Sequence, residues 1–220
     1  MFSQQPVETF MLPELFSHHL LPAHTRVNRH HKQVAKETKR WLFKGVKLGE
    51  EKRYSMTIDG LKHGLFGART YPYAALPQLR VCTDVLVYMF YLDDISDDMD
   101  NREIGAVADV VINSLHHPHS DRPERVGKMT RECVPIIARS SFDPNVSSIY
   151  KRIILTASQG AQHRFIGAME FTFQCLKTQA HQRMARVIPD LESYIALRRG
   201  ISGCLPCFAL IECDCRPFHV

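Results

Sequence analysis

The chain has 220 residues, 45% of them hydrophobic and 23% charged, which is typical of an ordinary globular protein with one sizeable core. The net charge of +5 is dispersed along the sequence, which argues against the concentrated basic surface of a nucleic-acid-binding protein. No apolar run approaches the length of a membrane span, and the first twenty residues lack the apolar core of a secretory signal. The odd number of cysteines, seven, favours reduced thiols in a cytoplasmic protein.

Helical periodicity dominates the chain, and we find no strand, no internal repeat and no alternation of strands with helices. The predicted helices cover residues 28–43, 50–60, 61–71, 77–97, 101–115, 128–139, 145–155, 162–185 and a last segment that opens at 189. The sequence therefore predicts an all-α fold and one domain over 1–220.

The helix predicted over 77–97 contains the most apolar run of the protein, residues 85–92. Because this run is apolar on every side of a helix, we expect it to be central and buried, with the other helices packed around it. Pro77 suits the first turn of such a helix.

Five aspartates follow this run within eight residues. Continued by one turn, the helix places Asp93 and Asp97 on one face with Asp94 beside them, above the apolar Leu86, Met89 and Phe90. Negative charge at the carboxyl end of a helix is unfavourable, and a bound cation relieves it. Oxygen ligands favour Mg²⁺, Mn²⁺ or Ca²⁺, and the calcium-loop pattern fails here for lack of its glycine and glutamate. The alternative is that these aspartates are solvent-facing caps, as Asp100 and Glu103 are expected to be in a capping box.

Two other clusters allow a metal interpretation. Residues 116–119 hold three histidines, but the proline among them favours an exposed loop. Near the carboxyl terminus, a C-x-x-C pair is followed by C-x-C, a pattern open to zinc binding although its spacing is irregular: Cys204, Cys207, Cys213 and Cys215.

Residues 197–203, Leu-Arg-Arg-Gly-Ile-Ser-Gly, interrupt an apolar helical pattern. Two glycines in four residues are expected to break the helix, and the paired Arg198 and Arg199 precede the break, where they can reach an anion. The alternative is an ordinary helix end with solvated arginines.

Taken together, these segments resemble class I terpene synthases, particularly the fungal sesquiterpene type. The resemblance covers most of the chain through an ordered set of motifs: the strap at 10–15, Asn28, Trp41, Tyr71-Pro72, Asp93-Asp94-x-x-Asp97, Arg122-Pro123, Tyr194 and Arg198-Arg199-x-x-Ser202-Gly203. It implies a class I terpenoid synthase-type helical bundle.

The resemblance also implies a mechanism. Asp93, with Asp94 and Asp97, would bind Mg²⁺ or Mn²⁺; Arg199 would sense the diphosphate, and Ser202 would link it to the backbone carbonyl of Gly203. A prenyl diphosphate, farnesyl diphosphate first, would ionise, and its carbocation would cyclise to a sesquiterpene. The implied protein is a monomer or weak homodimer.

The carbocation needs walls that are apolar and not nucleophilic, and aromatic faces stabilise it without trapping it. Phe66, Tyr71, Met89 and Phe90 are the candidate substrate-binding residues, although aromatic residues in such patterns are more often plain core.

The sequence also departs from the family. The second metal motif, Asn-Asp-x-x-Ser-x-x-x-Glu, is not found, and residues 213–220 do not match the family pattern. We therefore expect a bundle that lacks its last helices and has an open cavity. Two alternatives stay open: an inactive truncated fragment of such an enzyme, and a chain-elongating prenyl diphosphate synthase, although that class normally carries two aspartate-rich motifs.

Overall fold

The computed structural model describes residues 26–45, 63–117 and 144–211, which form eight α-helices and, within these ranges, no strand. The helices are α1 (His31–Gly45), α3 (His63–Thr70), α4 (Leu76–Ser96), α5 (Asn101–His116), α6 (Pro144–Thr156), α7 (Gln159–Ala185), α8 (Leu191–Ile201) and α9 (Cys204–Ile211). The all-α prediction is confirmed. The helices predicted over 50–60 and 128–139, and the strap at 10–15, lie outside the described residues.

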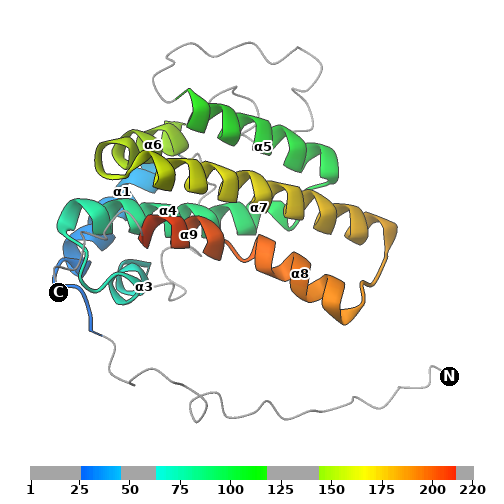
Figure 1. Ribbon diagram of the computed structural model, residues 1–220, viewed down its shortest axis with the longest axis horizontal. Coiled ribbons are helices and arrows are strands. Elements are labelled where there is room, and N and C mark those ends of the chain that lie inside the picture. Colours follow the sequence, from blue (N-terminus) through cyan, green and yellow to red (C-terminus); the bar gives the residue numbers. More distant parts are fainter. Residues whose placement is uncertain (1–25, 46–62, 118–143, 212–220) are drawn as a thin grey trace, which may run out of the picture.

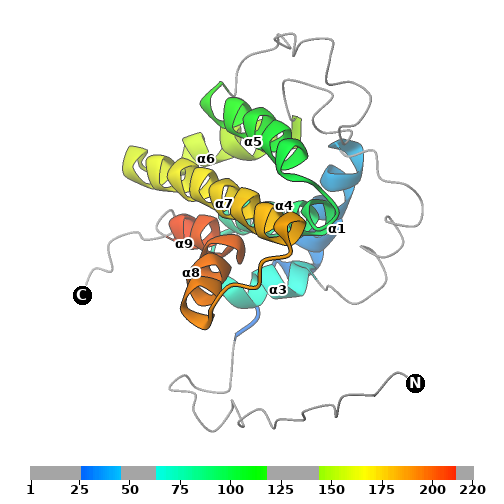
Figure 2. The same cartoon turned by 90° about the vertical axis from the view of Figure 1, so that its right-hand side faces the viewer.

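The apolar run predicted to be central is central. Twelve of the 21 residues of α4 are buried, and α1, α3, α6 and α9 all contact this helix. The long helix α7 lies between α5 on one side and α8 and α9 on the other, and α8 and α9 follow each other along its length (Figure 1). The view turned by 90° also shows α8 and α9 on the opposite side of α7 from α5 (Figure 2).

The ends of the helices follow local hydrogen bonding. The first described helix begins at His31 rather than at the predicted residue 28. Asn28 precedes it: its side-chain oxygen accepts from the N–H of His30, and its side-chain amide donates to the carbonyls of Tyr71 and Ala74. Asn28 thereby fixes the turn between α3 and α4. The predicted capping box is confirmed: Asp100 accepts from the backbone N–H of Glu103, whose carboxylate accepts from the N–H of Asp100.

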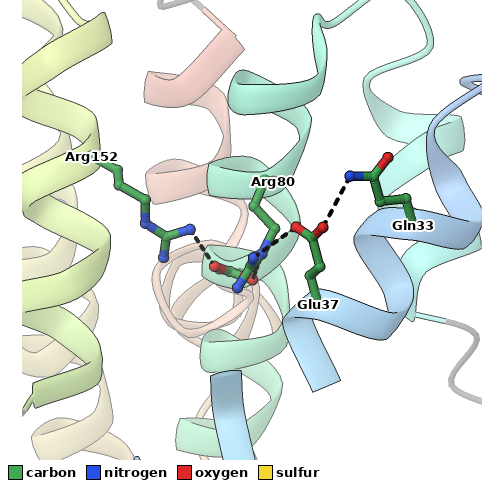
Figure 3. Close-up of polar contacts among 5 residues, drawn as sticks. Gln33, Glu37, Arg80 and Arg152 are labelled. Atoms are coloured by element: carbon green, nitrogen blue, oxygen red, sulfur yellow. Dashed lines mark hydrogen bonds and ion pairs between the residues drawn. The ribbon is translucent and has the colours of Figure 1, made fainter. Parts of the chain in front are cut away.

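An ion-pair network centred on the buried Asp84 joins α4 to α1 and α6 (Figure 3). Asp84 is fully buried within α4, and its carboxylate contacts Arg80 at 2.9 Å and Arg152 at 2.6 Å. Arg80 also reaches Glu37 on α1 at 3.1 Å. The network fixes α4 between two neighbouring helices. It therefore also helps to hold the position of the carboxyl end of α4, where the aspartates lie.

No single helix in the described ranges is long and apolar enough to cross a membrane. Within the same ranges, α8 and α9 reach the required length and composition when taken together, and they are bent by 50° at the break between them.

Candidate active site

A cavity of about 320 Å³ lies where α4 meets α3, α7, α8 and α9. Its walls are mostly apolar, and the charged side chains among its lining residues are Asp93 and Arg198. The lining residues are Phe66, Thr70, Leu86, Met89, Phe90, Leu92, Asp93, Thr172, Leu176, Arg198, Ile201, Ser202, Gly203, Cys204, Cys207 and Phe208. The structure thus brings the aspartate-rich end of α4 and the predicted helix break to one cavity.

The three predicted metal ligands are all exposed at the end of α4, but they are placed differently relative to the cavity. Asp93 lines it, whereas Asp94 and Asp97 lie outside the lining. Partial burial raises the pKa of the Asp93 carboxyl, the neighbouring Asp97 and Asp94 carboxylates raise it further, and the positive charge of Arg198 opposes them. Negative charge at this position is therefore incompletely balanced by the protein.

The carboxyl end of α4 is held from two sides. The hydroxyl of Ser96 donates to the carbonyl of Asp93 at 3.0 Å, and Arg183 at the end of α7 donates to the carbonyls of Ser96 and Met99. Sequence reasoning missed Arg183, because nothing local connects it with a helix end more than eighty residues earlier. Its cation satisfies carbonyls that the end of a helix leaves without an intrahelical partner.

The donor set fits a hard divalent cation. Carboxylates are the ligands that Mg²⁺ and Mn²⁺ prefer. The partial burial and the carboxylate repulsion that raise the pKa of Asp93 both penalise its negative charge, and a bound cation relieves that penalty. In the described part of the chain, no three His, Cys, Asp or Glu side chains are already grouped closely enough to hold a metal ion. Residue 93 is the aspartate best placed to connect a cation with the cavity.

The predicted helix break is confirmed: α8 ends at Ile201 and α9 begins at Cys204. Gly203 has φ of +69°, and a Cβ on it would lie 3.2 Å from Cε of Met89. The hydroxyl of Ser202 donates to the carbonyl of Arg199 at 3.0 Å and accepts from the N–H of Cys204 at 3.4 Å. Ser202 therefore bridges the break on both sides of Gly203.

Gly200 is needed for a different reason. A Cβ at this position would lie 2.2 Å from Sγ of Cys175 on α7, so only glycine lets the last turn of α8 approach that helix. This close contact holds the carboxyl end of α8, which carries Arg198, at the edge of the cavity.

The two arginines of the motif are both exposed, but they are placed differently. Arg198 lines the cavity together with Asp93, whereas Arg199, the predicted diphosphate sensor, is not among the lining residues. Sequence reasoning chose Arg199 through the resemblance, and its role as the sensor stays a prediction.

Three of the four predicted wall residues line the cavity. Phe66 and Phe90 pack edge to face, with ring centroids 6.0 Å apart and planes at 61°, and Met89 lies beside them. Tyr71 differs from the expectation: it is buried outside the lining, and its hydroxyl donates to the carbonyl of Cys207 at 3.0 Å. Tyr71 therefore supports α9 from behind the cavity instead of facing it.

Phe208, Leu176, Thr172 and Ile201 also line the cavity and were not predicted as wall residues from the sequence. Their apolar or helical pattern is the same as that of ordinary core residues, so no local signal marks them. Cys204 and Cys207 also line the cavity, and burial raises the pKa of Cys207 to about 12. The other two cysteines of the zinc alternative, Cys213 and Cys215, lie outside the described residues.

Comparison with known proteins identifies the family. The family model described as terpene synthase family 2, C-terminal metal binding, matches residues 84–217. Sesquiterpene synthase Agr1 of Cyclocybe aegerita is 50% identical over 208 residues, which are 94% of this chain and 54% of that protein. Sesquiterpene synthase 1 of Postia placenta is 45% identical over 202 residues, 92% of this chain and 54% of the relative. The chain therefore spans about half the length of these curated relatives.

Solved structures give the same fold. The crystal structure of the SVS_A2 protein, from ancestral sequence reconstruction, superposes with a TM-score of 0.69 at 22% identity, over 88% of this chain and 55% of that one. Linalool/nerolidol synthase from Streptomyces clavuligerus, in complex with 2-fluorogeranyl diphosphate, gives 0.68 at 22% identity, over 86% of this chain and 60% of that one. With its all-helical fold and its match to the family model over most of its length, the chain belongs to the terpene synthase family.

Proposed function

We propose that this chain carries the metal- and diphosphate-binding part of a sesquiterpene cyclase that ionises farnesyl diphosphate with Mg²⁺, or Mn²⁺ in its place. The observation that carries the proposal is that Asp93 lines the same apolar cavity as four residues at the helix break, Arg198, Ile201, Ser202 and Gly203. Two fungal relatives of the chain are sesquiterpene synthases, which supports the substrate class.

Asp93 would hold the cation from the cavity side, with Asp94 and Asp97 as further carboxylates at the same helix end. When bound, a divalent cation supplies positive charge that makes diphosphate a better leaving group. Two arginines of α8 supply further positive charge. Arg198 lines the cavity, and Arg199 follows it in the last turn of the helix. Guanidinium groups suit phosphate oxygens in charge and geometry.

The reaction breaks the bond between the allylic carbon and the diphosphate oxygen, and the electron pair leaves with the oxygen. The cation left behind is attacked by a double bond of its own chain and finally loses a proton. Phe66, Phe90 and Met89 offer it polarisable, non-nucleophilic surface, and the edge-to-face pair of phenyl rings fixes that wall. Ser202 would link Arg199 to the Gly203 carbonyl, since its hydroxyl bonds to the backbone on both sides of the break.

A second candidate is a chain that binds diphosphate without turning it over. The exposure of two cavity residues favours it, since Phe66 is 47% and Phe208 is 57% exposed. Water that reaches the cation would quench it before cyclisation. A chain-elongating prenyl diphosphate synthase is the weaker alternative, because the fungal relatives at 45–50% identity are sesquiterpene synthases.

Incubation with Mg²⁺ and geranyl, farnesyl or geranylgeranyl diphosphate separates these candidates. Volatile products are analysed by mass spectrometry and diphosphate release is followed by a colour assay, with Asp93→Asn as the control. A sesquiterpene that disappears in the variant supports the cyclase. Binding of diphosphate without release supports the second candidate, and a longer prenyl diphosphate would contradict both.

A further inference from the structure

Two cysteines line the candidate active-site cavity, and neither takes part in the proposed reaction. Cys204 is the first residue of α9 and Cys207 follows three residues later, so both lie in the first turn of this helix. Cys204 is exposed, whereas Cys207 is only 7% exposed and belongs to the hydrophobic core. An accessible thiol and a buried thiol therefore stand close together on one wall of the cavity.

The first turn of a helix brings two such cysteines within reach of a disulfide bond. Cα atoms three residues apart in an α-helix are separated by about 5 Å, which lies within the range of about 4.4–6.8 Å that disulfides span. Side chains three residues apart also share one face of the helix. Because the break at Gly203 leaves Cys204 at the end of α9, a small backbone rotation there can close the remaining gap between the two Cβ atoms.

The surroundings hold Cys207 in place and leave Cys204 accessible. The hydroxyl of Tyr71 donates to the backbone carbonyl of Cys207 at 3.0 Å, which anchors this turn from behind the cavity. The contacts of Cys204 are weaker: its N–H donates to the hydroxyl of Ser202 at 3.4 Å, and its thiol donates to the carbonyl of Ser202 at 3.8 Å. Cys204 is therefore the thiol that a dissolved reagent meets first.

We propose that Cys204 and Cys207 form a modification site that reacts with small disulfides, such as oxidised glutathione, to give a reversible disulfide bond across the first turn of α9. In the first step the thiolate of Cys204 attacks one sulfur of oxidised glutathione, and one glutathione leaves with the electron pair of the broken bond. In the second step Cys207 gives up its proton and attacks the sulfur of Cys204, and the second glutathione leaves. The chain is oxidised by two electrons, and the reagent is reduced to two glutathione molecules.

The burial of Cys207 sets the order of the two steps. Burial, with a further contribution from the neighbouring Cys204, raises the pKa of Cys207 to about 12, and a hydrogen bond from the Tyr71 side chain opposes this rise. The buried thiol therefore reacts poorly with a dissolved disulfide. A mixed disulfide on Cys204 instead presents the sulfur to be attacked directly beside Cys207, which makes the second step intramolecular.

The disulfide bond would also change the chemistry of the cavity wall. A thiol is a nucleophile, and the proposed reaction needs walls that do not trap a carbocation. Oxidation of the pair removes both thiols from the wall, and an excess of reduced glutathione restores them. This consequence rests on the proposed function, whereas formation of the bond does not.

Peptide mass spectrometry tests the site. The reduced chain is incubated with oxidised glutathione, the remaining thiols are blocked with N-ethylmaleimide, and the chain is digested with trypsin and glutamyl endopeptidase. The resulting peptide 200–212 contains Cys204 and Cys207 but not Cys213 or Cys215. We expect this peptide to be about 2 Da lighter than its reduced form and to carry neither glutathione nor N-ethylmaleimide, because the pair has lost two hydrogen atoms.

Serine variants separate the two steps. Cys207→Ser is expected to stop at the mixed disulfide, so that its peptide carries one glutathione. Cys204→Ser is expected to leave Cys207 without glutathione, because the buried thiol is not attacked first. The matched control replaces the other two cysteines of the same stretch, Cys213→Ser with Cys215→Ser, and is expected to leave the Cys204–Cys207 bond unchanged.

A synthetic peptide of residues 200–212 measures what the fold contributes. Reduction of half of the disulfide in the folded chain is expected to need at least about ten times more reduced glutathione than in the free peptide, since the helix holds the two thiols together. Four results overturn the proposal: no reaction, a stable glutathione adduct on the unsubstituted chain, a bridge from either residue to another cysteine, or equal resistance of chain and peptide. None of these measurements uses turnover, so a chain that forms this bond but no terpene contradicts only the proposed function.

Discussion

Gly203 packs against Met89, so that the helix break after α8 lies on the same face of α4 as Asp93, one turn further along. The glycine satisfies two demands here, a left-handed backbone with φ of +69° and a close approach to the Met89 side chain. This contact sets how far the arginine-bearing helix stands from the carboxylate-bearing one.

Gly203→Ala is therefore expected to destabilise the protein by about 1–2 kcal/mol, because a Cβ is disfavoured at this φ and Met89 must move. Urea unfolding at fixed pH measures the change in the free energy of unfolding. Gly167→Ala is the matched control: a Cβ there meets nothing within 4 Å, and it lies inside α7, so alanine should be neutral or stabilising by up to about 1 kcal/mol. Equal effects of the two substitutions would contradict the role of Gly203.

Sequence patterns predicted the helices and one side of the site well. The apolar run of α4 and the aspartates after it are local signals, and the structure places Leu86, Met89, Phe90 and Asp93 on one cavity wall as their spacing indicates. The two glycines of the break are equally local. Each of these features follows from periodicity within one helix, which the sequence displays directly.

What sequence reasoning missed depends on contacts between distant segments. Arg183 supports the end of α4 from another helix, and the hydroxyl of Tyr71 bonds to the backbone of α9, which turns this residue away from the predicted cavity wall. Asp84 did carry a signal, since it is a carboxylate inside a buried helix, but its partner Arg152 lies 68 residues later. Such pairings are set by tertiary packing.

Asp84→Asn is expected to destabilise the protein by about 3 kcal/mol, since it leaves Arg80 and Arg152 without the buried carboxylate that pairs with both. Glu37→Gln is the control from the same network. Its side chain is 37% exposed, and an exposed ion pair contributes about 1 kcal/mol or less. Thermal and urea unfolding of both variants measure the difference. A loss for Asp84→Asn no larger than that for Glu37→Gln would show that the network contributes little.

The raised pKa of Asp93 predicts a pH-dependent stability in the absence of metal. Because the folded protein penalises the ionised carboxyl, the penalty is present at neutral pH and fades as the pH falls through the raised pKa toward 3.8, the ordinary value. Asp93→Asn should therefore stabilise the metal-free protein at neutral pH, with a gain that shrinks in acid. Saturating Mg²⁺ should reverse the order at neutral pH by stabilising only the parent protein. A variant less stable than its parent at neutral pH without metal would contradict this assignment.

The cysteines at the break are expected to differ in reactivity. Burial raises the pKa of Cys207 to about 12, so almost none of this thiol is ionised in mildly alkaline buffer, whereas Cys204 is exposed. Iodoacetamide followed by peptide mass spectrometry should show Cys204 modified and Cys207 protected, with both modified after unfolding in guanidinium. Protection of both residues by stoichiometric zinc would instead support the zinc alternative.

Substitutions of the two arginines of the motif are expected to lower the affinity for diphosphate to different extents. Arg198 lines the cavity and its charge acts on Asp93, whereas Arg199 lies outside the lining and contacts Ser202 through its backbone carbonyl. Calorimetry with inorganic diphosphate and Mg²⁺ is expected to show at least about a tenfold loss of affinity for Arg198→Gln, consistent with the loss of about 1.4 kcal/mol or more from a charged hydrogen bond. Arg199→Gln would lose as much affinity only if the Arg199 side chain enters the cavity when diphosphate binds, as the family resemblance implies for a sensor. A loss confined to Arg199→Gln would show that the free protein holds Arg198 in a place that the ligand does not use.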